Sequence, residues 1–138
     1  ISGYGSYGGV VNTMPSGAAR PLVIGRNEAD MAIAYAHAMA IGGGLVYVEN
    51  GRVIATLPLR YGGLQSEESA AQVAQQLLAF KQATDAAGER PGDIVVMTRF
   101  LTFSSLPFIR LTQAGVIDVK TRQVLYQGGP PRERKVRM

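Results

Sequence analysis

One histidine and ten carboxylates are the side chains of this 138-residue sequence that could carry acid–base or metal chemistry, because the sequence contains no cysteine. His37 has no second histidine with which to bind a metal, and no serine stands at an offset that would form a catalytic dyad. We interpret it as a half-buried or exposed histidine of a helix. These counts exclude multi-histidine metal centres, thiol nucleophiles, iron–sulfur clusters and disulfides.

The carboxylates are mostly found in the first turns of predicted helices or at turns, where they cap helices or face solvent. These residues are Glu28, Asp30, Glu49, Glu67, Glu68, Glu89 and Asp93. None belongs to a pair inside an apolar run, the setting that raises the pKa of a catalytic acid. We therefore predict no catalytic residue and no metal ligand in this chain.

Two glycine-containing loops are candidates for ligand binding. Gly42–Gly44 follow a predicted helix and precede a strand, the reverse of the order in a phosphate-binding loop, so they are interpreted as a helix end and a tight turn. The second loop consists of Gly62, Gly63, Leu64, Gln65 and Ser66 and leads into a helix. Such a loop suits contact with a ligand or a neighbouring domain. The alternative is a loop that only begins the helix.

The elements before that loop are indicated by local signals. The apolar run Leu22–Ile24 predicts a buried strand, and Asn27 is a good N-cap for a helix that ends at Gly42. Its predicted inner face consists of Met31, Ala34, Tyr35, Ala38 and Ile41. Leu45–Val48 and Arg52–Leu57 are predicted to form an antiparallel hairpin, because Asn50 and Gly51 are a strong turn signal.

The elements after the loop complete the predicted fold. Ser66 is expected to cap a second helix that ends at Gly88, with an inner stripe of Ala70, Val73, Ala74, Leu77 and Leu78. Ile94–Met97 and Leu101–Phe103 are predicted strands, and Val116–Val119 with Gln123–Tyr126 a terminal hairpin. The pattern predicts an α+β fold with a mixed, mostly antiparallel sheet packed against two main helices.

Composition divides the chain into three parts. Residues 1–20 are a glycine-rich segment that we interpret as a connection from an earlier domain, with Val10 and Val11 beginning an edge strand; residues 21–127 form the domain, and residues 128–138 are a basic tail. The tail accounts for +3 of the net charge of +4, so the body is nearly neutral and nucleic-acid binding is not expected. The longest uncharged stretch is interrupted by glycines, and no secretory signal is recognised, so we expect a cytoplasmic protein without a membrane partner.

Several motifs follow one another in a characteristic order. Residues 25–32 read Gly-Arg-Asn-Glu-Ala-Asp-Met-Ala, residues 41–46 Ile-Gly-Gly-Gly-Leu-Val, residues 50–53 Asn-Gly-Arg-Val, and residues 57–59 Leu-Pro-Leu. Residues 63–66 read Gly-Leu-Gln-Ser, residues 101–109 Leu-Thr-Phe-Ser-Ser-Leu-Pro-Phe-Ile, and residues 115–119 Gly-Val-Ile-Asp-Val. In this order and spacing the chain resembles the C-terminal domain of bacterial adenine deaminases, of the amidohydrolase superfamily, over residues 21–119.

The resemblance implies a function for a longer protein. It implies that an amidohydrolase barrel precedes this region, holds a divalent metal, and converts adenine to hypoxanthine and ammonia by attack of a metal-activated water. The chain departs from the family at residues 16–20, where the family usually has His-Asp-Ser-His-Asn, and at Gln65, where it has Met. Either the parent enzyme acts on a different substrate, or its deaminase chemistry is lost or re-routed.

Two hypotheses follow. In the first, the chain is an accessory C-terminal domain, inert alone, that packs against the barrel and contributes the loop of residues 62–66 to the mouth of its site. In the second, it is a free-standing ligand-binding or protein-interaction module without catalysis. Homo-oligomerisation is a further expectation, because a domain detached from its barrel exposes apolar surface.

Overall fold

The computed structural model describes residues 6–14, 21–87 and 93–127. The elements in chain order are β1 (Gly9–Asn12), β2 (Leu22–Ile24), α1 (Glu28–Ala40), β3 (Gly44–Glu49), β4 (Arg52–Pro58), α2 (Ala70–Ala87), α3 (Ile94–Leu101), β5 (Ile109–Thr112), β6 (Gly115–Asp118) and β7 (Gln123–Gln127). The predicted α+β class is confirmed. The strands form two separate sheets, and the strand pairs of both are antiparallel in the described residues.

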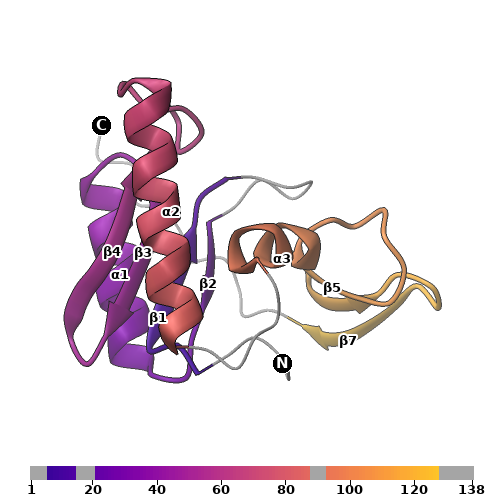
Figure 1. The fold of residues 1–138 in the computed structure, drawn as a ribbon. Helices are drawn as coiled ribbons and strands as arrows, with labels where there is room; N and C mark the ends of the chain where they lie inside the picture. Colours follow the sequence, from indigo (N-terminus) through magenta and orange to yellow (C-terminus); the bar gives the residue numbers. More distant parts are fainter. Residues whose placement is uncertain (1–5, 15–20, 88–92, 128–138) are drawn as a thin grey trace, which may run out of the picture.

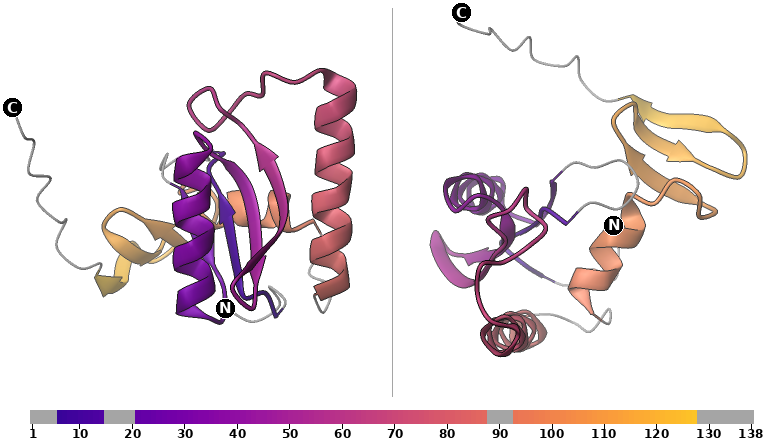
Figure 2. Two further views of the ribbon diagram at one scale, coloured as in Figure 1. Left: turned by 90° about the vertical axis from the view of Figure 1, so that its left-hand side faces the viewer. Right: turned by 90° about the horizontal axis from the view of Figure 1, so that it is seen from above.

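The larger sheet has the strand order β2-β1-β3-β4 and lies between two helices, α1 on one face and α2 on the other (Figure 1; Figure 2). Alternate residues of β1 and β3 point to opposite faces. Val11 and Val46 are directly paired and pack with Ala34 and Ala38 of α1. On the other face, the neighbouring pair Val10 and Tyr47 packs with Phe80 of α2. Because both faces are covered, β1 and the first five residues of β3 are buried throughout.

The predicted edge strand at Val10 and Val11 is in fact an interior strand, so that prediction is wrong. β1 pairs with β2 on one side and with β3 on the other. Glycine at position 9 reflects close packing, because a Cβ placed there would come within 2.6 Å of the backbone of Asp30 in α1. Residues 9–12 of the predicted N-terminal segment therefore belong to the sheet, while the three-part division of the chain stays a prediction. Residues 15–20 and the basic tail lie outside the described residues.

Helix α1 begins and ends as predicted. Asn27 Oδ1 accepts hydrogen bonds from the N–H groups of Ala29 (2.9 Å) and Asp30 (3.3 Å). After the helix, the N–H of Gly43 donates to the carbonyl oxygen of Ala38 at 2.7 Å. The predicted inner face is partly wrong, because Tyr35 is 46% exposed whereas the charged Asp30 is buried.

The β3–β4 hairpin is confirmed at the predicted turn. Asn50 and Gly51 have φ angles of 51° and 75°, the left-handed conformation that a two-residue turn of this type requires. The turn matches the right-handed twist of the flanking strands, so the register from Glu49–Arg52 back to Gly44–Pro58 follows from it, with one irregularity between Tyr47 and Val48.

Helix α2 starts later than predicted. Ser66 does not cap it, since the helix begins at Ala70 and Ser69 forms the cap with Gln72. Gln72 Oε1 accepts from the backbone N–H and from the hydroxyl of Ser69, at 3.1 and 2.6 Å. This is a capping box with glutamine in the third position. The buried side chains of α2 are Phe80 and Thr84, and Leu78 of the predicted stripe is 57% exposed. The predicted helix end at Gly88 lies outside the described part of the chain.

The predicted strands Ile94–Met97 and Leu101–Phe103 are wrong, because residues 94–101 form helix α3. Asp93 is its N-cap and accepts from the N–H groups of Val95 (3.0 Å) and Val96 (3.4 Å). Ile94 and Val95 are buried against the α2 side of the larger sheet. The β-branched residues that favour a strand thus pack as one face of a short helix.

The second sheet has the order β5-β6-β7, and its β6–β7 pair is the predicted terminal hairpin. It stands beside α3, away from the larger sheet (Figure 1; Figure 2). We refer to residues 93–127, which comprise α3 and this sheet, as the C-terminal lobe, and to the rest of the described residues as the body. No helix in the described ranges is long and apolar enough to cross a membrane.

Candidate functional site

The predicted loop of residues 62–66 is a compact turn. An isolated antiparallel bridge pairs Tyr61 with Gln65, and the N–H of Tyr61 donates to the carbonyl oxygen of Gln65 at 3.1 Å. Gly62 and Gly63 have φ angles of 63° and 76°, which residues with side chains rarely adopt. The turn is therefore closed by its own backbone and depends on the two glycines that the sequence singled out.

Thr13 fastens this loop to the larger sheet. Its hydroxyl accepts from the N–H of Gly44 (2.7 Å) and donates to the carbonyl oxygen of Gly63 (2.9 Å). A Cβ on Gly63 would approach this hydroxyl oxygen to 2.8 Å, so the close contact also requires glycine there. Sequence analysis missed Thr13, and no local signal marks it, since its partners lie 31 and 50 residues away.

The side chains that this loop presents are apolar or neutral. Leu64 is 50% and Tyr61 59% exposed, and Gln65 faces solvent. Ser66 Oγ accepts from the N–H of Glu68 at 3.1 Å, so this hydroxyl orders the segment before α2. Ser69 and Gln72 bond to each other at the start of α2, so this helix end is capped by its own side chains and not by the loop. The arrangement fits contact with a surface, and no carboxylate, histidine or lysine belongs to residues 62–66.

A polar cluster at the other end of the larger sheet centres on Glu49. One carboxylate oxygen accepts from the N–H of Gly8 (2.7 Å) and from the Tyr47 hydroxyl (3.1 Å), and the other binds Arg26 at 3.0 Å. Burial alone would raise the pKa of Glu49, but the hydrogen bonds from Gly8, Arg26 and Tyr47 hold it below its ordinary value. Burial, together with the hydrogen bond to Glu49, raises the pKa of Tyr47 to about 12. An ionised Glu49 that accepts these three hydrogen bonds links the residue before β1 to the end of β3 and to Arg26, and is not poised as an acid.

Asp30 binds the turn of the β3–β4 hairpin. Its two carboxylate oxygens accept separately from the N–H groups of Asn50 (2.9 Å) and Gly51 (2.7 Å), and the residue is 2% exposed. The sequence predicted a capping role at the start of α1. The structure instead assigns it to a turn 20 residues away, which only the tertiary fold could reveal.

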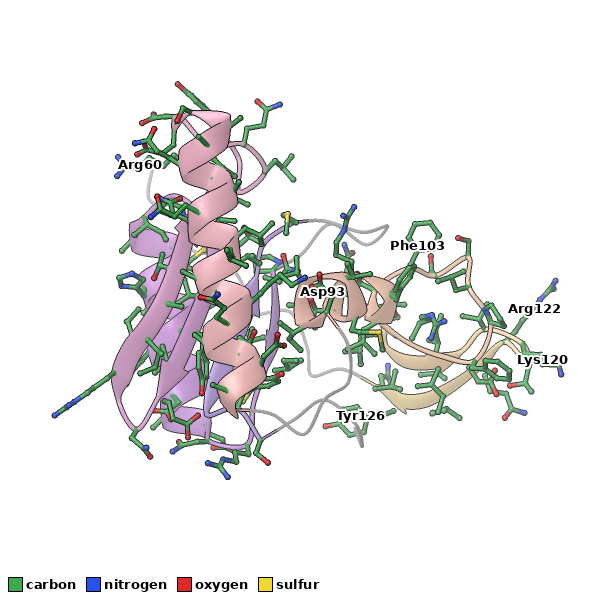
Figure 3. All side chains as sticks on the ribbon, in the orientation of Figure 1. Arg60, Asp93, Phe103, Lys120, Arg122 and Tyr126 are labelled. Carbon is green, nitrogen blue, oxygen red and sulfur yellow. The ribbon has the colours of Figure 1, made fainter. Side chains whose placement is uncertain are left out.

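Two polar links join the C-terminal lobe to the body. Asn12 of β1 donates to Thr98 Oγ1 at 2.9 Å and to the carbonyl oxygen of Val95 at 3.3 Å. Lys81 of α2 binds Asp93 at 2.8 Å, where Asp93 also caps α3 (Figure 3). Burial would raise the pKa of Asp93, but the hydrogen bond from Lys81 and those from the start of α3 lower it. Both links stabilise the position of α3.

These clusters are not grouped as a metal site. Within residues 6–14, 21–87 and 93–127 no three His, Asp or Glu side chains are grouped so that they could hold a metal ion. His37 is half-buried on α1, as interpreted from the sequence. Glu49, Asp30 and Asp93 all accept hydrogen bonds from backbone N–H groups, so each is engaged within the fold.

Comparison with known proteins assigns the chain to a family. The profile of the adenine deaminase C-terminal domain matches residues 1–123. The chain belongs to this family. Curated adenine deaminases agree: that of Kosmotoga olearia is 36% identical over 120 residues, which is 86% of this chain and 21% of the relative. That of Shigella sonnei is 34% identical over 121 residues, 87% of this chain and 21% of the relative.

As an adenine deaminase C-terminal domain, the chain spans about a fifth of the length of the curated relatives it matches. The matched region includes β1, so the family relation extends over the glycine-rich N-terminal segment. The divergent residues 16–20 lie outside the described residues. The divalent metal that the resemblance implies for the barrel does not fit the described side chains of this chain, because no three His, Asp or Glu side chains are grouped there.

Proposed function

We propose that this chain is the accessory C-terminal domain of an adenine-deaminase-like, metal-dependent amidohydrolase, and that it is catalytically inert by itself. The parent reaction is the hydrolytic deamination of adenine to hypoxanthine and ammonia. The observation that carries the proposal is the family match over residues 1–123, in a chain that spans a fifth of its relatives. The described side chains offer no metal-binding group, so the reacting atoms would be held by the remainder of the enzyme.

The loop of residues 62–66 is the part of the body that we assign to contact with the catalytic region. In the closed turn, the side chains of Leu64 and Tyr61 are exposed, while the Thr13 hydroxyl donates a hydrogen bond to the carbonyl oxygen of Gly63. A rigid loop with exposed apolar side chains can contact a neighbouring domain without the entropy cost of ordering a flexible segment. Its role in the mouth of the adenine site rests on this exposure and on its fixed position.

The inertness of the isolated chain is tested directly. The 138-residue chain, incubated with adenine and with Mn²⁺, Fe²⁺ or Zn²⁺ in turn, should form no hypoxanthine or ammonia and should retain no stoichiometric metal after dialysis. Detectable turnover, or one equivalent of bound metal, would show that the chain carries its own centre and would overturn the proposal.

The accessory role is tested in a chimera. In the Kosmotoga olearia adenine deaminase, this chain replaces the fifth of the enzyme that it matches. We expect the chimera to retain adenine deaminase activity that deletion of the same fifth abolishes. A folded but inactive chimera would contradict the accessory role and favour a free-standing binding module.

The loop assignment has a matched control within the same chimera. Leu64→Lys should lower kcat/KM for adenine several-fold, whereas Ile54→Lys on β4 should not, although both side chains are 50% exposed in the isolated domain. Equal activity of the two variants would remove the loop from the proposal and leave the accessory role intact.

For the complete protein we expect a cytoplasmic location, and no nucleic-acid or membrane partner.

A further inference from the structure

The C-terminal lobe exposes an unusual amount of apolar side chain. Phe100 on the outer face of α3 is 48% exposed and Ile109 of β5 is 52% exposed. On β7, Val124, Leu125 and Tyr126 are 57%, 51% and 68% exposed. Soluble monomers rarely leave so many large apolar groups of one region in water unless another surface covers them.

The sheet of the lobe has no core of its own. No residue of β5, β6 or β7 is buried, and all five residues of β7 are exposed. A three-stranded sheet needs a buried apolar face to be stable in water. Only one side of α3, through Ile94, Val95 and Thr98, is buried against the body. The remaining surface of the lobe stands free of the body (Figure 1; Figure 2).

Phe108 adds an independent observation. It precedes β5 with a φ of 69°, a conformation that aromatic residues seldom adopt, and its side chain is 66% exposed. The N–H of Val119 donates a hydrogen bond to the carbonyl oxygen of Phe108 at 3.0 Å. The exposed aromatic ring itself is not packed into a core in the isolated chain, and backbone strain of this kind is typical of binding positions.

A second copy of the chain is a poor occupant for the free edge of β7. The pairing of β6 with β7 shifts register between Val116 and Ile117, so that Leu125 has no direct partner and β7 bulges there. A bulge on an edge strand hinders edge-to-edge pairing between copies. The curated relatives supply another occupant, the polypeptide outside the matched region, which makes up about four-fifths of their length.

We infer that the outer surface of the C-terminal lobe is the docking surface for the catalytic region of the same polypeptide. This inference rests on the proposed function and identifies a second contact region besides the loop of residues 62–66. Figure 3 shows Arg60, next to that loop, at the opposite end of the molecule from Lys120 and Arg122 of the lobe. The catalytic region would therefore contact the domain at both ends. Contacts between domains of one chain commonly bury about 600–1,500 Å².

The test uses two matched pairs of variants, in the isolated chain and in the Kosmotoga olearia chimera. Phe100→Lys on α3 is paired with Leu78→Lys on α2, and Leu125→Lys on the edge strand β7 with Ile54→Lys on the edge strand β4. The exposed fractions are 48% and 57% in the first pair and 51% and 50% in the second. Each lobe variant thus has a body control on the same kind of element and at similar exposure.

The readout is hydrogen–deuterium exchange of peptides from residues 102–108 and 119–127. In the chimera these peptides should exchange at least about tenfold more slowly than in the isolated chain, because docking suppresses local opening of the lobe. Phe100→Lys and Leu125→Lys should restore fast exchange in the chimera, and the two body controls should not. In the isolated chain the four variants should leave exchange in the body unchanged.

Two results would overturn the inference. One is equal exchange of the lobe peptides in the chimera and in the isolated chain. The other is a concentration-dependent dimer of the isolated chain, measured by sedimentation velocity, that Leu125→Lys abolishes, since a second copy would then cover the lobe. These two results are independent of catalysis. Adenine turnover by the isolated chain would refute the proposed function, but it would not change the hydrogen–deuterium exchange measured for the lobe in the chimera.

Discussion

Asp30 is a buried charge whose role is purely architectural. It is 2% exposed and divides its carboxylate oxygens between the N–H groups of Asn50 and Gly51. Without this carboxylate, both N–H groups would lose their acceptor within the fold, which costs stability. The side chain thus joins the first turn of α1 to the hairpin on the same face of the sheet.

Replacing Asp30 should therefore weaken the whole fold. Asp30→Asn places an amide donor against an N–H that needs an acceptor, and we expect a loss of about 1–3 kcal/mol in the free energy of unfolding. Urea denaturation followed by circular dichroism measures it. Glu28→Gln, an exposed change in the same helical turn, is the control and should stay within about 0.5 kcal/mol of the parent.

Glu49 gives the stability a defined dependence on pH. Its folded pKa lies below the ordinary value of 4.5, because the hydrogen bonds from Gly8, Arg26 and Tyr47 outweigh the effect of burial. A carboxylate with a lowered folded pKa stabilises the fold above its unfolded pKa, and this contribution is lost as the pH falls through the folded pKa. Glu49→Gln lacks it.

The difference in unfolding free energy between the parent and Glu49→Gln should accordingly narrow as the pH is lowered from about 6 to about 3. Denaturation series at closely spaced pH values measure this. Asp93 and Asp118 also have lowered pKa values and weaken both proteins equally in acid, so only the difference is diagnostic. A constant difference over this range would mean that Glu49 is not held in its ionised form by these partners.

At the scale of elements, two glycines that both have positive φ angles have very different surroundings. Gly44 at the start of β3 has a φ of 141°, and a Cβ there would overlap the carbonyl oxygen of Leu57. Gly62 in the loop has a φ of 63° but no neighbouring atom within 4 Å of such a Cβ. Strain of the backbone acts at both positions, whereas a clash acts only at the first.

Gly44→Ala should thus destabilise the protein by more than about 3 kcal/mol, because strain and overlap with backbone add. Gly62→Ala should lower the free energy of unfolding by about 1–2 kcal/mol, because only the left-handed backbone conformation is unfavourable there. Thermal unfolding of the two variants side by side measures the difference. Equal losses would show that the hairpin adjusts freely around Leu57.

The sequence predicted an element correctly where the residues that define it are adjacent in the sequence. The Asn50–Gly51 turn and the Asn27 cap are specified by adjacent residues, and both were predicted correctly. Helix α3 was missed because Ile94–Val96 favour a strand locally, and the cap at Asp93 was the signal that could have corrected this. Likewise, Gln72 three residues after Ser69 distinguishes the true start of α2 from Ser66.

The loop of residues 62–66 was located from its glycines, but the side chains that hold its surroundings were not. Thr13 fastens the loop across separations of 31 and 50 residues, and Asn12 holds helix α3 across 86 residues, so only the pairing of β1 inside the sheet brings both to their partners. The position of β1 was itself mispredicted, since Val10 and Val11 were interpreted as the start of an edge strand in a glycine-rich connection, whereas β1 is an interior strand. Long-range polar contacts of this kind have no local pattern from which they could be inferred.

At the scale of the whole molecule, stability should be unevenly distributed. The body has a sheet covered on both faces, whereas the lobe is joined to it by one face of α3 and the links at Asn12 and Lys81. In the isolated chain, amides of β6 and β7 should exchange at least about a hundredfold faster than those of β1 and β3, through an opening that leaves the body folded. Uniform exchange rates across both sheets would show that body and lobe unfold as a single unit.

The hairpin turn also affects how the protein ages chemically. An asparagine followed by glycine is prone to deamidation, because the unhindered glycine nitrogen can attack the side-chain carbonyl carbon and close a succinimide ring. In the folded chain the N–H of that nitrogen, in Gly51, is bound by Asp30 at 2.7 Å. Ring closure must therefore wait until the turn opens, and stored protein should accumulate isoaspartate at position 50 only as fast as α1 releases the hairpin.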